Sequence, residues 1–363
     1  MNTTLYPGRY FQGYDALSIL GDEISRIGKK GLVVCGPYVF ENHLPSFRQK
    51  LGNVIDFTVE KSNWECSDEA VGHLSKIAEN ARCDIIVGIG GGKTLDKAKA
   101  VAHTLKTRVV VVPTIASTNA PCSALAIINT PNGRFKDYLT LSKNPDVVIL
   151  DTKFIVNAPV RYLIAGMGNA LSSWFETESS HRKYSANATD KGTHTMAYTS
   201  ALLCYESLLK YGVLAKIACE VHAVTPALEQ IVEANTLLSG LGLERNRLAA
   251  AHSIYNGLTV LEQTRSFFHG EKIAFSTLTS LFLTGKPADV VDEVYTFCYQ
   301  VGLPITLAEI GLAQATEGDL MKVAEIACAA GETIHNEPAP VTARMVFSAL
   351  KAADAEGRRR KLL

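Results

Sequence analysis

The first 150 residues alternate short apolar runs with longer segments in which apolar residues recur at helical spacing. The short runs are rich in valine and isoleucine, and several end at glycine or proline, which is typical of buried strands that stop at a turn. Strands separated by helices predict a parallel sheet with helices on its faces. The predicted strands are Gly31–Cys35, Ile85–Val87, Val109–Pro113 and Val147–Leu150, and the predicted helices are Glu69–Ala81 and Thr94–Leu105.

The pattern changes after about Pro159, where β-branched runs disappear and long segments rich in Ala, Leu, Glu and Ser follow. Such segments joined by short loops predict an all-α domain. We therefore expect an α/β domain over residues 1–158, a helical domain over residues 159–363, and a functional site in the cleft between them. The predicted helical segments are Leu163–Ser180, Met196–Tyr211, Ala215–Leu241, Arg247–Val260, Ala288–Val301 and Leu320–Ala330.

Composition narrows the class of protein. The chain has 363 residues, of which 47% are hydrophobic and 20% charged, and its formal net charge is zero, so nothing points to nucleic acid or an anionic membrane as partner. No apolar run approaches membrane-spanning length, and the N-terminus lacks the features of a signal sequence, so we expect a cytoplasmic protein. The eight cysteines form no CxxC pair and are expected to be small buried hydrophobes.

A glycine run is the strongest motif for ligand binding. The predicted strand from Ile85 leads into Gly90, Gly91 and Gly92, and Lys93 and a predicted helix follow directly. Glycines let the backbone approach a phosphate closely, and a helix that begins there directs unpaired N–H groups at an anion. The run therefore predicts a phosphate-bearing ligand, foremost a dinucleotide; the alternative is a tight turn without a ligand.

Two further motifs carry polar side chains that suit a site. A hydroxyl-rich loop with Thr114, Ser117 and Ser123 follows a predicted strand, and its hydroxyls can donate to pyrophosphate and ribose oxygens or simply cap turns. His252 on a predicted helix and His269 in an expected later loop could meet on one zinc ion. On the two histidines alone, isolated polar residues in a core are the alternative.

Longer blocks around these motifs resemble the glycerol dehydrogenases of the iron-containing, or group III, alcohol dehydrogenase superfamily. They are Gly-Gly-Gly-Lys-Thr-Leu-Asp at 90–96, Pro-Thr-Ile-Ala-Ser-Thr-Asn-Ala-Pro-Cys-Ser-Ala-Leu at 113–125, Leu-Ala-Ala-Ala-His at 248–252 and His-Gly-Glu-Lys at 269–272. The resemblance covers nearly the whole chain. It implies a Rossmann-like parallel-sheet domain followed by an all-α domain, the dehydroquinate synthase-like fold. It also implies a homo-oligomer and hydride transfer between a nicotinamide and a small alcohol or its carbonyl.

The resemblance also implies roles for individual residues. His252 and His269 match two of the family's three metal ligands. The family often has an aspartate after the first strand of the nucleotide domain, where it bonds the adenosine ribose; here that position is Gly36, which admits NADP as well as NAD. The cofactor-binding residues that the resemblance implies are Gly36, Gly91, Gly92, Lys93, Thr114, Ser117, Ser123, Leu125 and Asn129.

Three departures from the family fall where the reaction would occur. The third metal ligand, an aspartate in the family, is Asn169; the substrate-side aspartate is Asn119; and a second histidine of the helix that carries His252 is Tyr255. A neutral amide is an uncommon zinc ligand, so zinc is expected to bind weakly or not at all. Tyr255 is then a candidate proton donor, although it could merely fill the space of the histidine.

The sequence therefore favours an NAD(P)-dependent oxidoreductase for a small carbonyl, imine or alcohol other than glycerol, with catalytic candidates Tyr255, Asn119, Asn169 and His252. Two alternatives stay open: an ordinary zinc-dependent glycerol or polyol dehydrogenase, and an inactive relative that only binds a dinucleotide. Arg245 and Arg247 lie where the family has small residues. They could receive a substrate carboxylate or phosphate, or could form a solvated helix start.

Overall fold

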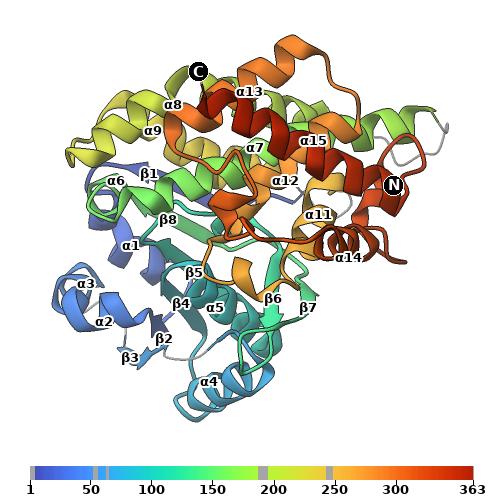
Figure 1. The fold of residues 1–363 in the computed structure, drawn as a ribbon. Coiled ribbons are helices and arrows are strands. Elements are labelled where there is room, and N and C mark those ends of the chain that lie inside the picture. The colour runs from blue at the N-terminus through green and yellow to red at the C-terminus, as the bar shows by residue number, and fades with distance from the viewer. Residues whose placement is uncertain (1–4, 52–55, 63–64, 187–194, 243–247, 363) are drawn as a thin grey trace.

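The structure is a computed structural model that describes residues 5–51, 56–62, 65–186, 195–242 and 248–362. Figure 1 shows a strand-containing part, coloured blue to green, beside a body of helices coloured green to red. This arrangement confirms the predicted α/β sheet followed by helices. The domain boundary at residues 158 and 159 stays a prediction.

One parallel sheet of six described strands, ordered β1-β8-β5-β4-β2-β3, organises the first part. The four predicted strands form its centre. The structure adds the two edge strands, whose sequences mix polar and apolar residues and whose side chains are only partly buried. An edge strand needs less apolar cover than a central one, so it lacks the continuous apolar run by which the others are recognised. The strands are β1 Arg9–Gly13, β2 Lys30–Cys35, β3 Asp56–Lys61, β4 Ile85–Gly90, β5 Arg108–Pro113 and β8 Val147–Asp151.

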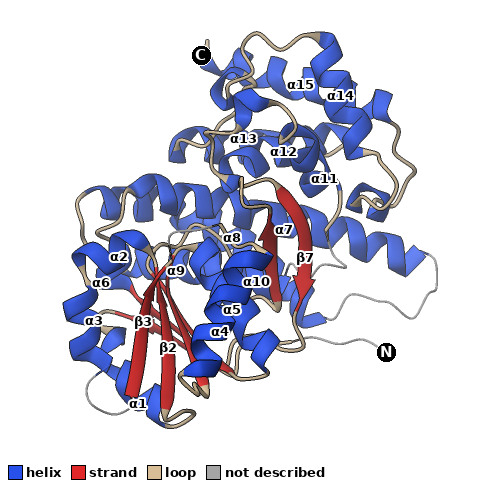
Figure 2. Ribbon diagram, turned by 90° about the horizontal axis from the view of Figure 1, so that it is seen from below, coloured by secondary structure: helices blue, strands red, loops and turns tan. Residues whose placement is uncertain are grey.

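Helices cover both faces of the sheet, with α2 and α3 on one side and α4 and α5 on the other (Figure 2). Leu20, Ile24 and Phe47 pack under one face, and Leu74 and Leu95 pack on the other. The predicted helices at 69–81 and 94–105 are confirmed as α4 and α5, with ends shifted by one or two residues. The helices of this part are α1 Leu20–Ser25, α2 Pro37–Asn42, α3 Leu44–Leu51, α4 Asp68–Asn80, α5 Gly92–Leu105 and α6 Thr152–Ile155.

A two-stranded hairpin projects from the sheet part toward the helical body (Figure 1). Its strands are β6 Leu125–Asn129 and β7 Phe135–Thr140, which pair antiparallel. The backbone N–H of Ile127 donates to the Asp96 carboxylate on α5 at 3.2 Å, which ties the hairpin to the helix after the glycine run. The hairpin was not predicted from the sequence.

The helical body confirms most of the predicted segments but corrects two, because Met196–Tyr211 continues without a break to Glu220, and it adds helices at 269–283 and 343–361. The segment 215–241 is not one helix, because the chain breaks between Glu220 and Pro226. Thr225 caps the new helix and Pro226 occupies its first turn. Both residues indicate the start of a helix, but the apolar spacing continues through the segment and led to the prediction of one long helix. No helix in the described part combines the length and apolar character needed to cross a bilayer. The helices are α7 Val160–Ala186, α8 Thr195–Glu220, α9 Pro226–Glu233, α10 Ser239–Gly242, α11 Ala250–Leu258, α12 His269–Leu283, α13 Ala288–Val301, α14 Glu317–Ala327 and α15 Ala343–Lys361.

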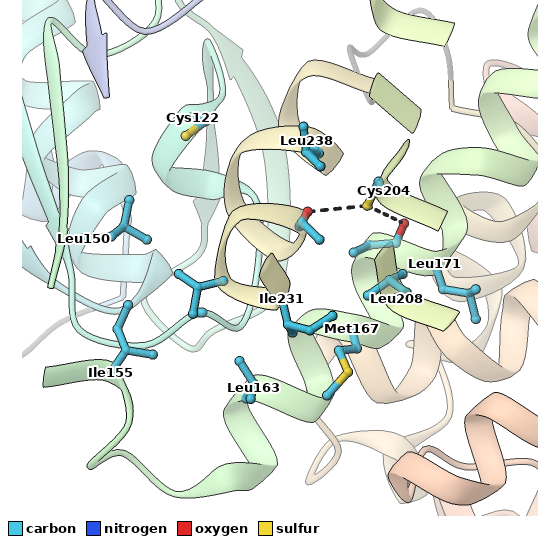
Figure 3. Packing of buried hydrophobic residues seen from close by; sticks show 14 of the residues in the cluster. Cys122, Leu150, Ile155, Leu163, Met167, Leu171, Cys204, Leu208, Ile231 and Leu238 are labelled. Atoms are coloured by element: carbon cyan, nitrogen blue, oxygen red, sulfur yellow. Dashed lines mark hydrogen bonds between the residues drawn. The ribbon is translucent and has the colours of Figure 1, made fainter. Parts of the chain in front are cut away.

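One apolar cluster joins the sheet to the helices (Figure 3). Leu150 and Cys122 enter it from the sheet part, and Met167 and Leu208 enter it from α7 and α8. All eight cysteines are free thiols, six of them buried and two half-buried. Because the cluster is continuous, the orientation of the helical body against the sheet is fixed by packing.

Glycines allow two helices to cross very closely at the centre of the molecule. A Cβ atom on Gly270 of α12 would lie 1.7 Å from the carbonyl oxygen of Ala165 on α7, and one on Gly168 would lie 2.3 Å from the carbonyl oxygen of Gly270. A Cβ on Gly166 would lie 2.0 Å from the carbonyl oxygen of Ala116, in the loop after β5. Only glycine fits at these three points, and the contacts bring α7, α12 and that loop together.

We expect the substitution Gly270→Ala to destabilise the protein, because the new methyl group must push α7 and α12 apart. Overpacking of this kind costs about 1–3 kcal/mol or more. Gly72→Ala on α4 is the matched control, since a Cβ there meets nothing within 4 Å and should stabilise the helix by about 0.5–1 kcal/mol. Thermal and urea unfolding of both variants measure the difference. A Gly270→Ala variant as stable as the wild type would contradict the close crossing.

Candidate active site

The glycine run forms the turn between β4 and α5 at the carboxyl edge of the sheet. Gly90 has a φ of 154°, a conformation that favours glycine, and a Cβ on Gly91 would lie 3.1 Å from the Ile115 side chain. Gly91 is the N-cap of α5 and brings no side chain to the start of the helix. Backbone and helix dipole are thus arranged as the anion-binding prediction requires.

Residues from the neighbouring strands lie beside this turn. The backbone N–H of Gly36, after β2, donates to the carbonyl of Ile89 at 2.8 Å, and that of Thr114, after β5, donates to the carbonyl of Gly90 at 3.1 Å. Three adjacent strands therefore bring together Gly36, the glycine run and Thr114 at one edge, where ligands bind in open parallel sheets. Ser117 follows in the same loop and is half-buried.

Lys93 is paired with a carboxylate that the sequence did not single out. Its Nζ lies 2.5 Å from Glu65 Oε1, and Asn129 Nδ2 donates to Glu65 Oε2 at 3.2 Å. Glu65 thereby ties the end of β6 to the first turn of α5. A phosphate at the glycine turn would have to share Lys93 with Glu65.

A second lysine anchors the hydroxyl-rich loop. Lys99 on α5 has a fully buried side chain, pairs with Asp96 at 2.9 Å, and donates to the carbonyl oxygens of Ala120 and Leu125 and to Ser123 Oγ. The Ser123 hydroxyl in turn donates to the Ala120 carbonyl at 3.2 Å. The positions of Ser123 and Leu125 thus depend on Lys99, while their predicted contacts to a cofactor remain predictions.

A second cluster lies where α7, α11 and α12 meet. Asn169 on α7 has its Oδ1 3.1 Å from His269 Nε2, and His252 and Tyr255 on α11 place their rings 5.7 and 4.4 Å from the His269 ring. The structure therefore brings together four of the predicted catalytic and metal-binding residues. His269 does not lie in a loop, as expected, but is the first residue of α12. The two residues before it, Phe267 and Phe268, are not typical helix caps, so the start of α12 was not recognised in the sequence.

Asn119 lies beside α10 and not in the cluster around His269. Asn119 precedes the short 3₁₀ turn Ala120–Cys122. A Cβ atom built on Gly240 of α10 would lie 3.5 Å from the Cβ atom of Asn119. Within the described residues, no hydrogen bond joins the Asn119 amide to the histidine pair. The loop that carries it is held by Asn235, whose Nδ2 donates to the carbonyls of Ala116 and Leu163, both at 3.0 Å.

His252 is oriented by a buried carboxylate on α7. Glu176 Oε2 lies 2.6 Å from His252 Nδ1, and Glu176 Oε1 accepts the backbone N–H groups of Ala249 and His252 at 2.9 and 3.0 Å. Helix α11 has no side-chain cap of its own, so Glu176 also serves as its N-terminal cap. The carboxylate fixes Nδ1 as the protonated nitrogen, which leaves Nε2 of His252 as a free acceptor facing the cluster.

Burial makes the remaining ionisable groups of the cluster neutral. Burial, followed by the neighbouring His252 and Lys272, lowers the pKa of His269 to about 3, so its imidazole is uncharged at neutral pH. Burial also raises the pKa of Tyr255 well above its ordinary value near 10, so that its phenol stays protonated. The cluster therefore offers neutral imidazole, phenol and amide groups.

This set of donors does not fit a firmly held zinc ion. In the described ranges, no three His, Cys, Asp or Glu side chains come together as a metal cluster. The third position is the amide of Asn169, whose buried Nδ2 has no hydrogen-bond partner that would orient it. Two imidazoles and a weakly oriented amide lack the negative charge that a carboxylate contributes to zinc binding.

Sequence reasoning missed the residues that support the site. Glu176 follows Asn169 by seven positions, two helical turns along the same face, and this spacing could have revealed it. Lys272 follows His269 by three positions in the same way. Glu65 carried no local signal, since its partners are distant in sequence. Arg245 and Arg247 lie outside the described residues.

The known proteins that this chain resembles are glycerol dehydrogenases and related oxidoreductases. The family model described as iron-containing alcohol dehydrogenase matches residues 7–152. Glycerol dehydrogenase from Thermotoga maritima is 57% identical over 363 residues, which is all of both chains. Glycolaldehyde reductase from Halobacterium salinarum is 39% identical over 97% of each chain. The crystal structure of a probable glycerol dehydrogenase from Sinorhizobium meliloti superposes with a TM-score of 0.91, at 38% identity over 99% of this chain and 100% of that one.

We expect Glu176→Gln to lower kcat/KM about 10–100-fold, because the amide nitrogen that replaces Oε2 cannot accept the Nδ1–H of His252, whereas the remaining amide oxygen can still cap α11. Glu176→Ala should also lower the thermal midpoint, because the cap is lost with the charge. The control is Glu79→Gln on the exposed face of α4. Steady-state kinetics and thermal unfolding separate the two roles. Wild-type activity of Glu176→Gln would contradict the orienting role.

Proposed function

This chain belongs to the glycerol dehydrogenase family of iron-containing alcohol dehydrogenases, and on that premise we propose that it transfers hydride between NAD or NADP and a small carbonyl, imine or alcohol other than glycerol. Membership makes it an oxidoreductase, as its motifs predicted. One observation carries the finer proposal: Asn169 and Tyr255 surround His269 in the cluster where catalysis would occur. The relative named glycolaldehyde reductase is consistent with a carbonyl substrate in this family.

The cofactor is proposed to bind along the carboxyl edge of the sheet. Gly91, Gly92 and Lys93 would contact the pyrophosphate, and Thr114 and Ser117 the nucleotide. Ser123, Leu125 and Asn129 would position the nicotinamide, supported by Lys99 and Glu65. Gly36 places no acidic side chain at the end of β2, so a 2′-phosphate meets no repulsion there and both NAD and NADP suit the site.

In the direction of carbonyl reduction, the reaction needs one hydride and one proton. A bound reduced nicotinamide would supply the hydride for the carbonyl or imine carbon, and the Tyr255 hydroxyl would donate its proton to the oxygen or nitrogen of the substrate. The products are the oxidised nicotinamide and the alcohol or amine, and solvent returns the proton to Tyr255. Asn169 and the His252 imidazole would bind and orient the polar group of the substrate. Asn119 would face it from the nucleotide side.

The neutral set of donors supports weak or absent zinc dependence. The alternative within the family, a zinc-dependent glycerol or polyol dehydrogenase, is favoured by the retained histidine pair and by the orienting bond from Glu176. In that case Asn169 Oδ1, His252 and His269 would hold the metal, which would polarise the alcohol oxygen. A catalytically inactive relative that only binds a dinucleotide is the alternative of another class.

We also propose a homo-oligomer. Four large apolar side chains on α8, together with Val221 directly after its end, are between 48% and 67% exposed, and their spacing places them along one side of the helix. Such a face is typical of a surface that is covered in an assembly. The side chains are Met196, Leu203, Leu214, Ile217 and Val221.

The proposed function is tested by metal analysis of the purified protein and by a substrate screen. Oxidation of NADH and NADPH is followed with ketones, aldehydes, oxo acids and cyclic imines, and reduction of NAD and NADP with glycerol, each with and without a chelator. We expect turnover of a carbonyl or imine that the chelator leaves unchanged. Glycerol oxidation that a chelator abolishes and zinc restores would establish the family alternative, and no turnover at all would establish the inactive relative.

Asn169→Asp is expected to create the missing carboxylate and so to raise zinc affinity by at least about 10-fold, because the ligand gains a charge. Zinc titration followed by calorimetry gives the affinity. Asn157→Asp, at an exposed position on the chain before α7, is the matched control for the added charge. Equal zinc affinity in Asn169→Asp and the wild type would contradict the assignment of Asn169 to the metal position.

Tyr255→Phe should lower kcat about 10²–10⁴-fold, the usual contribution of a positioned proton donor, while the Kd of the reduced cofactor stays unchanged. Stopped-flow kinetics and cofactor fluorescence measure the two quantities. Tyr299→Phe, at a 59% exposed position on α13, is the control. A Tyr255→Phe enzyme with wild-type kcat would show that the tyrosine only fills space.

A further inference from the structure

Lys272 has a largely buried amine that forms no ion pair with a carboxylate among the described residues. The residue is 7% exposed and lies on α12 one helical turn after His269. Its Nζ lies 5.4 Å from the centre of the Tyr255 ring. Within the described ranges, the Nζ atom makes no hydrogen bond or ion pair with an oxygen atom of the protein. The amine therefore borders the cluster without an oxygen partner there.

The nearest acidic residue along the chain is already occupied. Glu271 receives two bonds from Arg161, at 2.5 and 2.8 Å, and accepts the backbone N–H of Phe268 at 2.7 Å. These three bonds direct its carboxylate to the start of α12 and toward α7. The Arg161–Glu271 pair thus supports the fold, and Lys272 remains the unpaired member of this helical turn.

The groups around Lys272 do not repel an anion. Tyr255 presents a neutral phenol, His269 an uncharged imidazole and Asn169 an amide. The carboxylate of Glu176 lies behind His252 and is engaged by the ring nitrogen and by two backbone N–H groups. A negative group entering the cluster would therefore meet one ammonium and no free carboxylate among these neighbours.

Charges that are buried without a partner are costly, and they persist chiefly where a ligand or reaction needs them. Lys272 and His269 are three residues apart on α12, and His252 and Tyr255 are three residues apart on α11, so each pair lies on one face of its helix. The two faces meet at the Tyr255–His269 contact of 4.4 Å. Lys272 thus belongs to the wall of the same site and not to a separate structural core.

We propose that Lys272 binds the carboxylate of an anionic substrate, so that the site takes a small 2-oxo acid or a cyclic 2-imino acid. The inference rests on the proposed oxidoreductase function and adds the class of substrate to it. An anion paired with Lys272 lies against the ring whose hydroxyl gives the proton. The carboxylate and the reacting C=O or C=N are therefore close together, as they are when they sit on neighbouring carbons. Lys272 fixes the orientation of the substrate and takes no part in the proton transfer.

The test compares charged and neutral substrates of the same shape. Pyruvate is paired with hydroxyacetone, and 1-pyrroline-2-carboxylate is paired with 1-pyrroline, each with the full-length protein and reduced nicotinamide. The variants are Lys272→Met, which removes the charge at similar length, and Lys272→Arg, which keeps it. Lys286→Met, which removes a half-buried lysine paired with Glu178, is the control for loss of a lysine.

We expect Lys272→Met to lower kcat/KM for the carboxylates about 100-fold or more, because a charged hydrogen bond is lost, and to change it less than about 3-fold for the neutral partners. Lys272→Arg should keep part of the preference. The thermal midpoint of Lys272→Met should equal or exceed that of the wild type, because an unpaired buried charge is removed. Equal losses on charged and neutral substrates, or a wild type that prefers the neutral ones, would overturn the inference.

A binding measurement separates this inference from the proposed function. Oxamate, a carboxylate that is not reduced, is titrated into the complexes of wild type and Lys272→Met with NADH, and nicotinamide fluorescence reports binding. Tighter binding to the wild type by 10-fold or more supports the anion site even if no substrate of either pair turns over, an outcome that counts against the proposed function alone. Equal oxamate affinity in both proteins overturns the anion site whatever the turnover.

Discussion

The close crossing of α7 and α12 is the constraint on which the site depends. Without side chains at Gly168 and Gly270 the two backbones touch, and this contact sets Asn169 beside His269. Gly166, two residues before Gly168, receives the loop that follows β5 and carries Thr114 to Asn119. Helix α7 therefore sets the positions of both the loop after β5 and the cluster around His269. Catalysis requires reacting groups to be held in an accurate geometry. A displacement of either helix would therefore separate the groups that are proposed to act on one substrate.

Most of the fold could be predicted from the sequence because buried strands and amphipathic helices leave periodic apolar patterns. The central strands and helices α4, α5 and α13 follow those patterns closely. The failures have physical reasons. The edge strands β1 and β3 are half-exposed and need few apolar residues, and the break before Pro226 falls between two helices whose faces are both buried. The hairpin β6–β7 depends on Asp96 and Glu65, contacts that no local pattern records.

The residues of the candidate site were predicted from the sequence, but the side chains that hold them in position were not. Motifs located the glycine turn, the hydroxyl-rich loop and the residues Asn169, His252, Tyr255 and His269, which the structure places in one cluster. The residues that hold them were not predicted, because a buried Glu or Lys reveals its role only through partners far along the chain. Glu176 reaches from α7 to the start of α11, and Lys99 reaches from α5 to the hydroxyl-rich loop.

The division between acting and supporting residues has an evolutionary consequence. Glu176 caps α11 and orients His252, so a substitution there would weaken both the start of the helix and the orientation of the imidazole. The side chain of Asn169 makes a single hydrogen bond, to His269, and leaves its Nδ2 without a partner. A change at Asn169 removes one side-chain hydrogen bond, whereas a change at Glu176 removes three, so a lineage that alters the donors of the cluster loses fewer supporting bonds at Asn169 than at Glu176.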